Sequence, residues 1–128
     1  MKNTAPEKPV RMNGRGKTFA ITLENFFTKQ QGGTAYIIDA RPGWLFALGH
    51  IPGAVSIPAK INLDANLEKH EAGLAAAVNS GKTIVVYCSG LLCADARTVS
   101  SHLAAAGFSS AIYHGGWDGW KNAGMPVD

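Results

Sequence analysis

The run KTIVVYC at residues 82–88 is the most apolar of the expected strands in this 128-residue chain, and it limits the possible folds more than any other feature. A short, continuously apolar and β-branched run is typical of a strand buried on both faces, as in parallel sheets covered by helices. Residues 93–107 follow with helical spacing and a glycine stop, and further apolar runs lie at 34–40 and 110–116. This alternation predicts an α/β fold with an open, mostly parallel sheet flanked by helices on both faces.

The remaining elements are expected to be shorter. We predict an edge strand at 17–21, a helix that begins at Thr22 and ends at Gly32 and Gly33, and a strand at 55–57. Residues 64–81 are predicted to form one helix with Gly73 as a weak point. The segment after residue 40 is interpreted as a loop, and residues 117–128 as aromatic turns. The buried face of the helix at 93–107 is expected to hold Ala96, Val99, Leu103 and Ala106.

Composition indicates a single domain at residues 18–128, preceded by a basic, irregular lead-in at 1–17 that carries five basic residues against Glu7 alone. Basic residues this sparse, with no aromatic residues among them, do not favour nucleic-acid binding. No apolar run is long enough to cross a membrane, and no signal peptide precedes the domain as written. We therefore expect a cytoplasmic protein, or a periplasmic one if a signal was removed before residue 1, with no protein partner indicated.

Cys88 lies where the apolar strand is expected to end and a helix to follow. In open α/β sheets, ligands bind outside the carboxyl ends of the strands. A loop that enters a helix there points its amides into one concavity, which lowers the pKa of a thiol and holds anions, and Gly90 is expected to supply the torsions for it. Position alone supports two interpretations equally: a nucleophilic cysteine with an anionic substrate, or an inert buried cysteine.

Three motifs in order resemble those of rhodanese-like domains. They are IIDARPGWLFALGHIPGAVSIP at 37–58, VVYC with LAAAGF between 85 and 108, and YHGGWDGWKNAGMPV at 113–127. The resemblance runs from about Ile21 to Val127. It implies a five-stranded, mostly parallel sheet flanked by helices.

The resemblance also implies a sulfurtransferase of the thiosulfate type. Cys88 would take a sulfane sulfur from a small donor anion and hand it, as a persulfide, to a thiol or cyanide acceptor, without a metal or organic cofactor. Asp39 and His50 would support the site and Arg41 would also face the substrate. The amides of the loop would hold the anion, and these belong to Ser89, Gly90, Leu91, Leu92 and Cys93.

The loop departs from the family pattern, because Cys93 stands where an arginine often closes it and the segment up to Gly107 is about two residues longer. Arg97 is either a replacement for that charge or an exposed surface residue. A phosphatase-like hydrolase is disfavoured without the arginine. Cys93 has three open interpretations: a thiol that forms a disulfide with Cys88, a second sulfur carrier, or a small apolar residue. A non-catalytic, redox-sensing or binding domain that uses both cysteines is the main alternative function.

Overall fold

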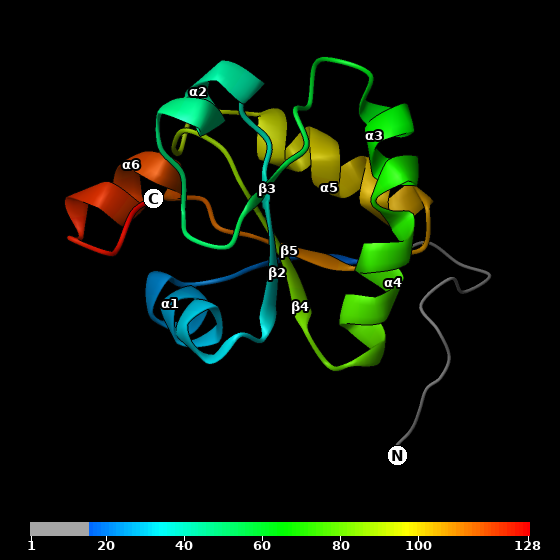
Figure 1. Cartoon of the computed structure of the whole chain (residues 1–128), viewed down its shortest axis with the longest axis horizontal. Coiled ribbons are helices and arrows are strands. Elements are labelled where there is room, and N and C mark those ends of the chain that lie inside the picture. Colours follow the sequence, from blue (N-terminus) through cyan, green and yellow to red (C-terminus); the bar gives the residue numbers. More distant parts are fainter. Residues whose placement is uncertain (1–15) are drawn as a thin grey trace.

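A computed structural model describes residues 16–128, which form one sheet between two layers of helices (Figure 1). The strands lie in the order β1-β5-β4-β2-β3, and every neighbouring pair is parallel. The predicted α/β fold is confirmed, and the sheet is wholly rather than mostly parallel. The strands are β1 (Thr18–Ala20), β2 (Ala35–Asp39), β3 (Val55–Ser56), β4 (Thr83–Tyr87) and β5 (Ser110–Ile112).

The helices divide between the two faces of the sheet. In Figure 1, α1 and α6 lie on one side, and α3, α4 and α5 lie on the other. The short α2 lies above the edge toward which β2 and β4 run. The helices are α1 (Leu23–Gly32), α2 (Gly43–Leu48), α3 (Leu63–Lys69), α4 (Glu71–Asn79), α5 (Asp95–Ala105) and α6 (Gly116–Asn122).

Residues 84–86 of the central strand β4 are all apolar because both faces of the strand are covered. Successive side chains of a strand point to opposite faces. Ile84, Val86 and Cys88 accordingly pack into the core cluster that includes residues of α3, α4 and α5. Val85 and Tyr87 pack into the other, with the aromatic residues of α1 and α6.

The helix predicted after residue 21 has the expected ends. The side chain of Thr22 accepts a hydrogen bond from the amide of Asn25 at 3.2 Å, and Gly33 closes α1 with a φ of 72°. Strands are found where they were expected, including the edge strand β1, which pairs with β5.

Three helical predictions were wrong. The helix expected at 64–81 is two helices that meet at His70, whose imidazole Nδ1 donates to the carbonyl oxygen of Asn66 at 2.9 Å. Gly73 does not interrupt α4; it leaves room for the ring of Tyr36. In α5 the buried alanines are Ala96, as predicted, and Ala104, whereas Ala106 follows the helix and is exposed.

The helices α2 and α6 were not predicted. Both are short, at 6 and 7 residues, and neither offers the two turns of apolar spacing that periodicity requires. Residues 1–15 of the predicted lead-in lie outside the described residues. Gly16 and Lys17 already bond to the domain, since Gly16 donates to the carbonyl oxygen of Ala104 and the Lys17 carbonyl accepts from Ser110.

Candidate active site

Cys88 directly follows β4, the strand between β5 and β2. Only 3% of its surface is exposed, and it packs in the core cluster beside the first turn of α5. A thiol at the carboxyl end of a central parallel strand occupies the position where open α/β sheets bind their ligands. The structure therefore places Cys88 where the sequence predicted it.

The loop that starts at Cys88 is held in place by α6. The amide of Trp117 donates to the carbonyl oxygen of Cys88 at 2.8 Å, and the amide of Asp118 donates to that of Ser89 at 2.9 Å. Gly116 permits this approach: its φ is 65°, and a Cβ there would lie 2.6 Å from the Cys88 carbonyl oxygen. Gly90 does not have the left-handed torsion that we expected of the loop. The left-handed torsion is found at Gly116 instead, in α6, the helix that supports the loop and that was not predicted.

Residues 90–93 form a tight turn that brings the second cysteine back to the first. The amide of Cys93 donates to the carbonyl oxygen of Gly90 at 3.1 Å. Cys88 and Cys93 are joined by a disulfide across a Cα–Cα distance of 6.4 Å, which lies in the usual range for this bond. Of the three interpretations of Cys93, the disulfide partner is the one seen in the structure.

The tip of the loop faces solvent. Leu91 is 76% exposed and Leu92 is fully exposed. Among residues 16–128, no acceptor takes the amides of Ser89, Gly90, Leu91 or Leu92. The amide of Cys93, in contrast, is used by the turn, and the expectation that the loop amides hold an anion stays a prediction.

A buried polar network lies below the loop, at the ends of β2 and β4. Arg41 donates to Asp39 through Nε at 3.0 Å and through Nη2 at 2.7 Å, and Nη2 also donates to the carbonyl oxygen of Gly49 at 2.7 Å. Tyr87 donates its hydroxyl proton to Asp39 at 2.7 Å and accepts the amide of Ile51 at 3.1 Å. The network ties β2, β4 and the segment before β3 together.

The members of this network are buried, and burial and their mutual contacts change the pKa values of Arg41 and Tyr87. Arg41 is only 2% exposed, and its guanidinium lies 4.9 Å from the ring centre of Trp117. Burial opposes the charge of Arg41, but the hydrogen bond and attraction of Asp39 outweigh it, so the pKa of the guanidinium is raised. Burial, reinforced by the charge of Asp39, also raises the pKa of Tyr87 far above its ordinary value. These contacts suit a structural role for Asp39 and Arg41, and the expectation that Arg41 also faces the substrate stays a prediction.

His50 ties the segment after α2 to the end of the chain. Its Nδ1 donates to the carbonyl oxygen of Phe46 at 2.9 Å, and its ring stacks on the Phe46 ring with centres 3.8 Å apart. Its backbone exchanges two hydrogen bonds with Asp128. These contacts suit the supporting role that was predicted for His50.

Arg97 makes no side-chain hydrogen bond or ion pair with the loop that it was proposed to serve, among the residues that the structure describes. Its side chain is exposed on α5, where it lines a hollow with Gly16, Thr18, Thr98 and Ser101. That position favours the interpretation of Arg97 as a surface residue.

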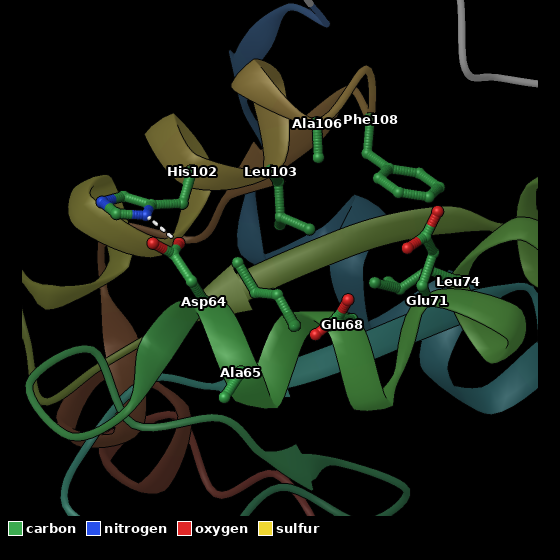
Figure 2. A pocket seen from close by; sticks show the side chains of 10 residues that line it. Asp64, Ala65, Glu68, Glu71, Leu74, His102, Leu103, Ala106 and Phe108 are labelled. Atoms are coloured by element: carbon green, nitrogen blue, oxygen red, sulfur yellow. Dashed lines mark hydrogen bonds and ion pairs between the residues drawn. The ribbon is translucent and has the colours of Figure 1, made fainter.

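A second hollow, of about 450 Å³, lies away from the cysteines, between α3, α4 and α5 (Figure 2). Its floor is apolar, with Leu67, Leu74 and Leu103, and its rim is acidic. On that rim, His102 and Asp64 are joined at 2.7 Å, the contact drawn as a dashed line in Figure 2. This hollow was not predicted from the sequence, because it forms only when helices distant in sequence are placed side by side.

Among residues 16–128, no group of three or more histidine, cysteine, aspartate or glutamate side chains is arranged to hold a metal ion. None of the helices in the same range has the length and apolar character that a membrane crossing requires.

Comparison with known families identifies the fold. The family model described as the rhodanese-like domain matches residues 23–123. This chain belongs to the rhodanese-like domain family. The matched range contains β2 to β5 and the entire Cys88 loop, so the resemblance noted from the three motifs is confirmed.

Solved structures give the same fold. The BH2092 protein of Bacillus halodurans is 24% identical, with a TM-score of 0.71 over 86% of this chain and 76% of that one. A protein from Lactobacillus plantarum is 26% identical, with a TM-score of 0.69 over 86% of this chain and 87% of that one. A thiosulfate sulfurtransferase from Pseudomonas aeruginosa is 25% identical, with a TM-score of 0.65 over 88% of this chain but only 20% of that protein.

A curated relative carries a different description. The HTH-type transcriptional regulator Rv0324 of Mycobacterium tuberculosis is 32% identical over 109 residues. The alignment covers 85% of this chain and 44% of the regulator, so this rhodanese-like domain spans less than half of that protein.

Proposed function

We propose that this rhodanese-like domain is a sulfurtransferase in which Cys88 carries the transferred sulfur as a persulfide. The observation that carries the proposal is the position of Cys88 at the head of a loop whose next four amides have no acceptor among the described residues. Such amides stabilise a thiolate and, after sulfur transfer, the anionic persulfide. Membership in the family and the likeness to a thiosulfate sulfurtransferase support the same reaction.

The donor is proposed to be a small anion with a sulfane sulfur, such as thiosulfate. The Cys88 thiolate attacks the outer sulfur, the sulfur–sulfur bond of thiosulfate breaks, and sulfite leaves with the bonding electrons. A thiol or cyanide then removes the sulfur from Cys88. The reaction requires the reduced loop, because the disulfide with Cys93 occupies the Cys88 sulfur.

Thiocyanate formation from thiosulfate and cyanide tests this proposal. We expect thiocyanate from reduced protein when cyanide is in large excess, because cyanide then removes the sulfur from Cys88 before Cys93 reacts with it, and none from Cys88→Ser. Ser101→Ala, a substitution of an exposed residue of α5, is the matched control and is expected to behave as the unaltered chain. Equal thiocyanate formation by Cys88→Ser would refute the role of Cys88.

A redox-sensing role is the second candidate, and the Cys88–Cys93 disulfide favours it. The similarity to part of a transcriptional regulator is compatible with a domain that reports on thiol oxidation or sulfane sulfur. The two candidates separate on turnover: a sensor forms the disulfide with oxidant but yields no thiocyanate over repeated cycles.

A further inference from the structure

We infer that the Cys93 thiol attacks the Cys88 persulfide. It displaces the outer sulfur as sulfide and leaves the Cys88–Cys93 disulfide. The inference rests on the proposed function, because it needs a persulfide on Cys88. It adds a product, sulfide, and a requirement, a dithiol reductant.

The geometry of the loop brings the two sulfurs together. The turn at residues 90–93 folds Cys93 back, and the two cysteines are in bonding contact across a Cα–Cα distance of 6.4 Å. Cys93 is half-buried and packs against the core cluster that contains Cys88. Its place beside Cys88 is thus supported by packing and by a backbone hydrogen bond in addition to the disulfide.

The attack is balanced without any external oxidant. The Cys93 thiol loses its proton and its sulfur attacks the inner sulfur of the persulfide, which is the sulfur of Cys88 itself. The bond to the outer sulfur breaks, and that sulfur takes the electron pair and the proton and leaves as HS⁻. The two cysteine sulfurs are oxidised to the disulfide, and the sulfane sulfur is reduced to sulfide.

The disulfide closes the site until it is reduced. Cys88 is 3% exposed in this form, so a donor anion does not reach its sulfur. Cys93 is half-buried whereas Cys88 is buried, so a reductant thiolate attacks at Cys93 and releases the Cys88 thiolate for the next cycle. Each cycle converts thiosulfate and a dithiol into sulfite, HS⁻, a proton and the oxidised dithiol.

A single turnover under anaerobic conditions tests the inference. Reduced protein, freed of reductant, is mixed with thiosulfate; sulfide is quantified and the protein is weighed by intact-mass spectrometry. We expect about one equivalent of sulfide per chain and a protein lighter by about two hydrogens. Protein without thiosulfate is expected to stay reduced. Cys93→Ser and Cys93→Ala are expected to gain about one sulfur atom and to release no sulfide.

The outcomes separate this inference from the proposed function. Unaltered protein that keeps the added sulfur and releases no sulfide overturns the inference and leaves the sulfurtransferase proposal standing. Sulfide release by the Cys93 variants equal to that of the unaltered chain also overturns it. Absence of both added sulfur and sulfide from every protein overturns the proposed function itself. The rate constant of sulfide release per chain should not change when the protein is diluted. A rate constant that rises in proportion to protein concentration would contradict an internal attack.

Discussion

The amide of Trp117 donates to the carbonyl oxygen of Cys88 at 2.8 Å, which fixes the start of the active-site loop to α6. This contact requires Gly116 to pass close to the loop backbone. A Cβ on Gly116 would lie 2.6 Å from the Cys88 carbonyl oxygen and 2.7 Å from the amide nitrogen of Gly90. Neither atom belongs to a flexible side chain, so neither moves aside cheaply.

We therefore predict that Gly116→Ala lowers the free energy of unfolding by about 3 kcal/mol or more. Gly124→Ala is the matched control: Gly124 has a φ of 76°, but nothing lies within 4 Å of its Cβ position. This control should lose only the torsional cost, about 1 kcal/mol. Urea unfolding of both variants measures the difference. Equal losses would mean that torsion, and not the approach to the Cys88 loop, accounts for the glycine.

Much of the fold was predictable because β4 and β2 are buried on both faces and therefore carry continuous apolar runs. Thr22 and Gly33 marked the ends of α1 through ordinary capping chemistry. The placement of Cys88 followed from the rule for parallel sheets. Each of these signals is local in sequence, so no knowledge of the tertiary contacts was needed.

The parts of the site that were missed depend on contacts between distant segments. Gly116 is constrained by a loop near residue 88, and nothing in its own neighbourhood reveals that contact. The family resemblance implied that Arg41 also faces the substrate, but its contacts with Asp39 and with the carbonyl oxygen of Gly49 could not be read from the sequence. The disulfide could be offered only as one of three interpretations, because the Cα–Cα distance cannot be read from spacing.

Arg41 provides a test of structural against substrate-binding roles. A lysine cannot reproduce the two-atom contact with Asp39 and the bond to Gly49, so Arg41→Lys should lower the free energy of unfolding by about 3 kcal/mol. The KM for thiosulfate should change little. Thermal unfolding and steady-state kinetics measure the two effects. A raised KM with unchanged stability would restore Arg41 to the substrate site.

Arg97→Lys is the matched comparison, because Arg97 is exposed on α5. We expect its stability to change by less than about 0.5 kcal/mol. A clear rise in its KM for thiosulfate would support the alternative in which Arg97 faces the anion.

The disulfide is expected to stabilise the oxidised domain. It closes a short loop, with a separation of 5 residues, and the chain-entropy model gives about 2 kcal/mol for a loop of this size. Urea unfolding with and without a dithiol reductant measures the difference in the unaltered chain. Cys93→Ser, which cannot form the bond, should unfold at the same urea concentration in both conditions. Equal stability of the oxidised and reduced unaltered chain would contradict the prediction.

Tyr87 is expected to make the domain less stable at alkaline pH. Burial, together with the nearby charge of Asp39, raises its pKa in the folded state, whereas an unfolded tyrosine titrates near 10. The contribution is fully present below about pH 10. Above that pH the unfolded chain loses a proton that the folded chain retains, so the free energy of unfolding falls by up to about 1.4 kcal/mol per pH unit.

Tyr87→Phe isolates this effect. The variant should be less stable at neutral pH by about 1–3 kcal/mol, because Asp39 loses a donor and the Ile51 amide loses its acceptor. Its loss of stability above pH 10 should be shallower than that of the unaltered chain. Tyr36 and Tyr113, whose pKa values are also raised by burial, are present in both proteins and cancel in the comparison. Urea unfolding across the alkaline range gives both slopes, and parallel slopes would show that Tyr87 ionises as readily in the folded chain as in the unfolded one.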